Sequence, residues 1–217
     1  MSHRPSTATS RPTKSELVKE FREREIIEAA RRVFTREGFQ SASMEKIAEE
    51  AGLAKGTIYL YFPNREQLII ETLGAGAHRF YSYCREQSPP TFEPEQRVRA
   101  LVRAMFQHAE EERDFQRALF IELNEWLFTP ARQHLVQGLI TAHEEFMSYI
   151  ASILEEGARC RKFRKADHRQ HAGYLFSLLG GLFRERLMGL NSSPVEEISA
   201  GVADFFLAAI GTKDRKP

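Results

Sequence analysis

The stretch MEKIAEEAGLAKGTIYLYF, residues 44–62, decides the fold. Its inward-facing positions follow helical spacing and are apolar: Met44, Ile47, Ala48, Ala51 and Leu53, then Ile58 and Phe62. Ser43 is placed to cap the first short helix, and Gly52 supplies a turn position that tolerates positive φ. Two short helices around a glycine turn have the geometry of a helix-turn-helix, whose second helix enters the major groove of DNA.

Longer helices are expected on both sides of this motif. Before it, an apolar face ends at Gly38 and consists of Ile26, Ala30, Val33 and Phe34. After it, Asn64 and Gln67 can form a capping pair for a helix that continues through Leu68 and Leu73. The motif is therefore predicted to lie inside a small helical head.

The positions of the second short helix that face outward can contact DNA. They are Lys55, Gly56, Thr57, Tyr59 and Tyr61. Lysine donates to guanine edges, glycine allows close backbone approach, hydroxyls donate to phosphate, and a tyrosine ring packs on a thymine methyl. From Leu53 to Arg65 there are two cations and no acid, although acids are dense just before this segment. The alternative is that Tyr59 and Phe62 are ordinary core aromatics and Lys55 is a solvated charge.

The stretch MEKIAEEAGLAKGTIYLYFPNREQL (44–68), together with IIEAARRVFTREGF (26–39), resembles the DNA-binding signature of the tetracycline-repressor (TetR/AcrR) family of bacterial transcription regulators. The resemblance covers about residues 22–82. It implies that Ser43, Thr57, Tyr61 and Arg65 contact phosphates and that Lys55, Gly56 and Tyr59 face bases. One position departs from the pattern, because Ala54 replaces the usual Ser or Thr and cannot cap the reading helix.

The remaining chain also has helical periodicity. Residues 86–94 contain three prolines and form the clearest connector. We find no strand-like alternation, so the predicted fold class is all-α with about nine helices. The predicted organisation is a flexible basic arm over residues 1–17, a helix-turn-helix head over 18–84 with its motif at about 44–63, and a helical ligand-binding and dimerisation body over 85–217.

The last two helices are predicted to form a homodimer interface. Their apolar residues cover more than one face, and Gly180-Gly181 allows helix backbones to approach closely. The candidate interface residues are Leu175, Leu178, Leu179, Gly180, Gly181, Leu182, Phe183, Val202, Phe205 and Phe206. The alternative is a buried helical hairpin within one chain.

The body is also predicted to hold an apolar pocket for a lipophilic or aromatic effector that releases the protein from a palindromic operator. The candidate lining residues are Met105, Phe106, His108, Phe120, Glu122, Asn124, Trp126 and Phe146. Each of them can instead be plain core. His168 and His171 are spaced for one helix face, but surface histidines explain them better than a metal site, and we expect no metal or cofactor.

Composition excludes several other classes. The 217 residues carry a net charge of +1, with a basic front (12 Lys and Arg against 9 Asp and Glu over residues 1–65) and an acidic remainder (19 against 21). Two distant cysteines exclude a disulfide framework, and the absence of long apolar runs predicts a cytoplasmic chain with no membrane contact.

Two rival functions are open at this stage. An all-α enzyme is disfavoured because no catalytic motif is present, so we expect no catalytic residues. A DNA-binding adaptor controlled by a protein partner would have a closed body without a cavity.

Overall fold

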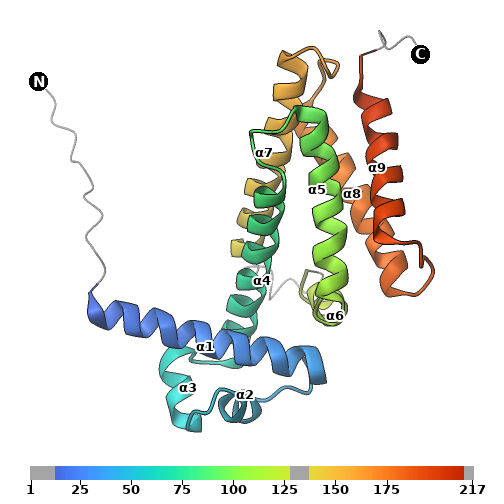
Figure 1. Cartoon of the computed structure of the whole chain (residues 1–217). Helices are drawn as coiled ribbons and strands as arrows, with labels where there is room; N and C mark the ends of the chain where they lie inside the picture. Colours follow the sequence, from blue (N-terminus) through green and yellow to red (C-terminus); the bar gives the residue numbers. More distant parts are fainter. Residues whose placement is uncertain (1–12, 128–136, 213–217) are drawn as a thin grey trace, which may run out of the picture. The chain divides into compact units, whose positions relative to one another are not determined.

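The computed structural model describes residues 13–127 and 137–212, without the side chains of 121–127 (Figure 1). Over these ranges the regular elements are the helices α1 to α9, and the extended pairing is a single bridge between Phe163 and Gly211. The predicted all-α class is therefore confirmed. Contacts divide the chain into two compact units, residues 1–69 and 70–217, which meet inside helix α4 (Arg65–Gln87). The predicted boundary between residues 84 and 85 instead lies near the end of that helix.

The first unit contains α1 (Lys14–Glu37), α2 (Met44–Glu50), α3 (Lys55–Tyr61) and the start of α4. α2 packs against both α1 and α3. The core of this unit is formed by residues from all four helices, namely Ile26, Ala29, Ala30, Val33, Phe34, Ile47, Ala48, Ile58, Leu68 and Ile69. Most of these apolar positions are the ones whose spacing predicted the helices.

Helix α1 begins at Lys14, within the segment that we expected to be a flexible arm. Thr13 caps it, and the Glu16 carboxylate accepts a hydrogen bond from the Thr13 N–H at 2.6 Å, which completes a capping box. Leu17 and Val18 remain about half exposed, at 48% and 55%. Local capping rather than burial therefore specifies the first turn, and a search for apolar periodicity does not detect it.

The caps of α2 and α4 agree with the sequence. The Ser43 hydroxyl oxygen accepts the Lys46 N–H at 3.3 Å, and the Asn64 side-chain oxygen accepts the Gln67 N–H at 2.8 Å. Ala54 occupies the cap position of α3 in an extended conformation and makes no side-chain hydrogen bond. Helix α3 thus begins without the side-chain cap that α2 has.

The second unit contains the rest of α4 together with α5 (Pro94–Glu111), α6 (Arg113–Leu127), α7 (Gln137–Arg159), α8 (His168–Leu187) and α9 (Val195–Ile210). α9 packs on α5, and α8 packs on α7 (Figure 1). Their contact faces form one apolar cluster that includes Leu101, Phe106, Ile150, Leu175 and Phe206. None of the helices described here is long and apolar enough to cross a membrane.

This packing changes the expectation for the dimer interface. Leu175, Leu179, Val202 and Phe206 are at most 8% exposed within the single chain, so they belong to its core. Their apolar spacing correctly indicated that these side chains are buried. It does not indicate whether a helix of the same chain or of a second copy buries them. Phe205, at 68%, and Gly180 are exposed, and the others are partly buried: Leu178, Gly181, Leu182 and Phe183. Only these residues stay available to a second copy.

Candidate DNA-reading face and effector cavity

A glycine turn sets the angle between α2 and α3. Gly52 has φ of +67°, a left-handed conformation that favours glycine. The Leu53 N–H donates to the Ala48 carbonyl at 2.8 Å, and the Gly52 N–H donates to the Glu49 carbonyl at 3.0 Å. These bonds satisfy the end of α2 while the chain reverses direction. The turn therefore has the geometry that the sequence predicted.

Two side chains hold the inner side of α3 in place. Ile58 is fully buried, and Phe62, which follows the helix, is 4% exposed. Lys55, Gly56 and Tyr59 are exposed. The exposed residues lie on a firmly packed helix, which is the arrangement needed to present them to a groove.

The predicted phosphate contacts divide into two kinds. Thr57 and Tyr61 are half-buried and lie beside the exposed face of α3. Arg65 is also half-buried, and its Nε donates to the Ala42 carbonyl at 2.8 Å. Arg65 thus ties the start of α4 to the residues before α2, next to Ser43.

Gly56 has no structural need to be glycine within the chain. Its backbone is not in the left-handed region, and an added Cβ would meet no atom within 4 Å. Gly56 is the second residue of α3, and glycine in a helix costs up to about 0.5–1 kcal/mol relative to alanine. The folded chain therefore gives no reason for glycine here, whereas close approach of DNA would supply one.

Leu60 is a surface residue that the sequence analysis did not identify. Its side chain is 81% exposed, an unusual state for leucine in a short, well-packed helix. The signal was present in the sequence, because Leu60 is two positions from the buried Ile58 and so points to the other side of α3. An exposed leucine beside Tyr59 adds apolar surface of the kind that contacts thymine methyl groups.

Ion pairs fix α2 against α1. Glu50 accepts from Arg32 at 2.7 Å and from Arg36 at 3.1 Å, and the Lys46 ammonium lies 2.5 Å from Glu37. Bonds from the Arg32 and Arg36 side chains hold the pKa of Glu50 below its usual value. These pairs join the two helices that position the reading helix.

A further ion pair joins α2 to α3. The Glu45 carboxylate contacts the Lys55 ammonium, with side-chain exposures of 52% and 59%. The hydrogen bond from Lys55, together with weaker bonds from the Glu45 backbone N–H and the Ser43 hydroxyl, lowers the pKa of Glu45 to about 2. The same contact raises the pKa of Lys55. Lys55 is therefore exposed yet already engaged with an anion.

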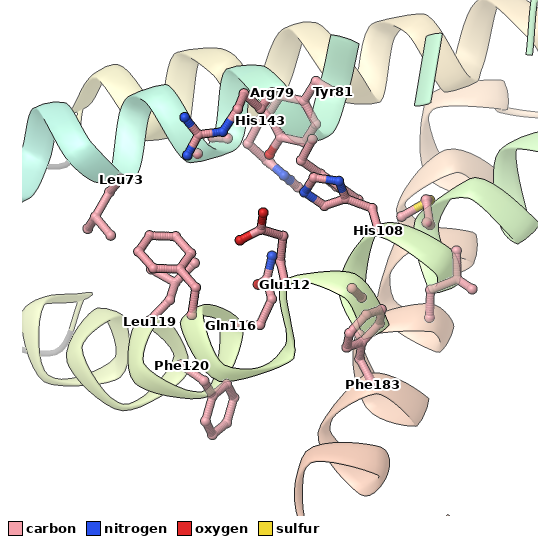
Figure 2. A pocket seen from close by; sticks show the side chains of 18 of the residues that line it. Leu73, Arg79, Tyr81, His108, Glu112, Gln116, Leu119, Phe120, His143 and Phe183 are labelled. Atoms are coloured by element: carbon pink, nitrogen blue, oxygen red, sulfur yellow. The ribbon is translucent and has the colours of Figure 1, made fainter. Parts of the chain in front are cut away.

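The second unit contains a cavity of about 560 Å³. It lies between α4, α5, α6, α7 and α8 (Figure 2). Its wall is mostly apolar and includes Leu73, Phe80, Phe115, Leu119, Phe120, Leu139, Ile140, Phe176 and Phe183. A cavity of this size and lining suits a lipophilic small molecule.

The residues that were expected to line a pocket lie in different places. Met105, His108 and Phe120 line the cavity. Phe106 and Phe146 do not, because they are buried behind the wall, where Phe106 stacks on Phe183 and Phe146 stacks on Tyr81. The side chains of Glu122, Asn124 and Trp126 lie outside the described residues. Much of the wall comes from α4, α7 and α8, whose distant positions in the sequence gave no sign that they meet.

Polar groups gather on part of the wall. Glu112 and Gln116 point into the cavity from the α5–α6 region, toward the side where Arg79, His108 and His143 lie (Figure 2). Burial lowers the pKa of His108, and Arg79 lowers it further, while Glu112 and Glu111 oppose the shift. Burial and Arg169 lower the pKa of His143. The lowered pKa values favour the neutral form of both imidazoles, which lie on the same wall as Arg79 and Glu112.

Comparison with known proteins identifies the same helix-turn-helix region. The sequence pattern described as bacterial regulatory proteins, tetR family, matches residues 26–72. The HTH-type transcriptional regulator YhgD of Bacillus subtilis is 29% identical over 147 residues, which are 67% of this chain and 74% of YhgD. The HTH-type transcriptional repressor KstR of Rhodococcus jostii is 32% identical over 81 residues, 37% of each chain.

Solved structures share the fold over most of the chain. The structure of the transcriptional regulator FadR from Bacillus subtilis in complex with stearoyl-CoA aligns with a TM-score of 0.72 and 20% identity, covering 86% of this chain and 98% of FadR. The tetR-type match over the helix-turn-helix and the HTH-type regulators among the relatives identify a DNA-binding transcription regulator. Residues 26–72 thus have the DNA-binding signature of the tetR family of bacterial regulatory proteins, and the relatives that resemble this chain are transcription regulators.

Proposed function

We propose that the protein is a homodimeric repressor that leaves a palindromic DNA operator when a lipophilic effector enters its body. The observation that carries this proposal is the presence in one chain of an exposed α3 face and a cavity of about 560 Å³. The cavity argues against the rival adaptor, for which a closed body was expected.

DNA contact is proposed to follow the two sides of α3. Lys55, Gly56 and Tyr59 meet base edges, with Leu60 beside them, because these residues are exposed on a firmly packed helix. Ser43, Thr57 and Tyr61 contact phosphates from the flanks. Arg65 acts first as a positioning residue through its bond to the Ala42 carbonyl.

A second copy of the chain is proposed to bind at the exposed parts of α8 and α9, around Gly180 and Phe205. Phe205 is 68% exposed, and a large exposed aromatic side chain is typical of a protein contact. A two-fold dimer would place two reading helices about 34–36 Å apart, the separation of successive major grooves. An effector that changes this separation weakens binding to the operator.

The effector is proposed to carry a long apolar part and a polar head. The apolar wall accepts a hydrocarbon chain or aromatic ring, and the polar wall with Arg79 and His108 accepts the head. The FadR structure, which has the same fold, is a complex with stearoyl-CoA, and this supports an acyl compound as the first candidate.

Helix α4 is the proposed connection between effector and DNA. Its residues Leu68 and Ile69 are buried in the first unit, and its residues Leu73 and Phe80 line the cavity of the second. A ligand that displaces the α4 wall therefore acts on a helix that continues into the head.

The experiment selects bound fragments from a random duplex library, measures the mass of the protein in solution, and titrates the complex with stearoyl-CoA. A palindromic fragment, a dimeric mass and release by stearoyl-CoA support the proposal. A monomeric mass on and off DNA contradicts the dimer. Failure of stearoyl-CoA and of other lipophilic compounds to affect DNA binding or thermal stability contradicts the effector. Tighter DNA binding with the effector contradicts this mechanism of release.

A further inference from the structure

One carboxylate engages two of the groups that are proposed to contact DNA. Glu45 lies in the first turn of α2, and its carboxylate accepts from the Lys55 ammonium and from the Ser43 hydroxyl. Lys55 is the first residue of α3, and Ser43 caps α2. The contact thus links the residue before α2 to the first residue of α3, and both are proposed to contact DNA.

The chemistry of this contact resembles that of a phosphate contact. A carboxylate and a DNA phosphate both offer anionic oxygens, and both accept from an ammonium and a hydroxyl. We propose that Glu45 is an internal competitor for DNA: it holds the Lys55 and Ser43 donors in the free protein and must give up Lys55 when α3 enters the groove. This inference rests on the proposed contacts of α3.

The neighbouring acids of α2 have a different role. Glu50 is engaged by Arg32 and Arg36 of α1, and these bonds join helices without involving a proposed DNA contact. Glu49 is exposed on α2 and is not the partner of Lys55. Competition with DNA is therefore a property of the position of Glu45, and a general increase in positive charge is not expected to reproduce it.

The competition has a measurable size and sign. Exposed ion pairs are weak, so removing the charge of Glu45 is expected to tighten DNA binding by only about two- to five-fold. When Lys55 binds DNA, the Glu45 carboxylate loses its partner and lies near phosphates. It then binds a cation from solution, and this uptake offsets one of the counterions released from DNA. The slope of log K against log salt concentration is expected to become steeper by about 0.9 when this carboxylate is absent.

The test compares Glu45→Gln with Glu49→Gln in the full-length protein. Glutamine keeps the shape of the side chain and its hydrogen-bonding oxygen, but it removes the charge. The probes are the duplex that the wild-type protein selects from a random library and a scrambled duplex of the same composition, each titrated by fluorescence anisotropy at several salt concentrations. Circular dichroism and thermal melting verify that each variant is folded.

The expected result is that Glu45→Gln binds both duplexes more tightly with a steeper salt slope, while Glu49→Gln stays close to wild type. Equal effects of the two substitutions would overturn the inference, because total charge would then explain the gain. Unchanged or weaker binding by folded Glu45→Gln would also overturn it, because Glu45 would then have only a structural role in α2. A wild-type protein that binds neither duplex would overturn the proposed DNA contacts themselves.

Discussion

Gly56 is the residue at which fold and function place opposite demands on one side chain. Space for a Cβ is open in the free protein, and alanine favours the helix by about 0.5–1 kcal/mol. A methyl group on the exposed side of α3 would separate the backbone from base edges. Packing within the chain therefore does not explain the glycine, whereas the proposed approach of DNA does.

Gly56→Ala is therefore expected to raise the free energy of unfolding and to weaken operator binding by about tenfold or more. Urea denaturation and anisotropy titration measure the two effects. Gly74→Ala is the matched control, because an added Cβ at Gly74 in α4 also meets no atom within 4 Å. It should retain operator binding, and equal DNA affinities of both variants and wild type would show that Gly56 is not approached closely.

His108 and His143 make the stability of the body depend on pH. Burial holds the pKa of each below 6.5 in the folded protein. As pH falls below about 6.5, the unfolded chain takes up protons that the folded chain does not, so stability decreases. Replacing both histidines by glutamine is expected to reduce this loss of stability at acid pH. The loss is measured as the difference in urea midpoint between about pH 7.5 and about pH 5.5. An unchanged difference would mean that neither histidine is held neutral.

Among the elements, α3 is short and begins without a side-chain cap. Ala54 has extended dihedral angles, φ of −66° and ψ of 143°, which a capping serine also adopts. The packing of Ile58 and Phe62 must therefore hold the helix. α2 has the same length and does have a cap, from Ser43.

Ala54→Ser is expected to stabilise the protein by about 1 kcal/mol, because its hydroxyl can accept an N–H of the first turn of α3. Ser43→Ala is expected to destabilise it by a similar amount. Denaturant titration of both variants measures the pair. A destabilising effect of Ala54→Ser would show that the N–H groups of the first turn of α3 already have other hydrogen-bond partners.

The elements also show where sequence reasoning succeeds. Residues close together in the chain, such as Ser43 with Lys46 and Asn64 with Gln67, predicted the caps because each contact is local. The cavity wall joins α4 to α8, so Phe183 and Arg79 had no shared pattern in the sequence. Leu175 and Phe206 were expected at the dimer interface, but they are buried within the single chain. Apolar periodicity indicates that a residue is buried, but it does not indicate which helix packs against it.

At the scale of the whole molecule, α4 belongs to both units, and its residues line the cavity. The proposed response to an effector therefore requires space beside α4. Ala77 lines this space and is small enough to be replaced by a larger side chain that fills part of it.

Ala77→Trp is expected to weaken stearoyl-CoA binding by about tenfold or more and to leave operator binding intact, because the ring occupies cavity volume. Thermal shift and anisotropy measure ligand and DNA binding separately. If folded Ala77→Trp responds to the compound as wild type does, the effector binds elsewhere.

The most direct test of the central claim is selection of DNA fragments from a random library, followed by titration of the best fragment with wild type, Lys55→Ala and Tyr59→Ala. Both side chains are exposed, so their removal should preserve the fold. The account predicts a palindromic site that binds in a salt-dependent manner and is lost in both variants. Absence of an enriched site, or binding unaffected by both substitutions, would contradict the claim that α3 reads DNA.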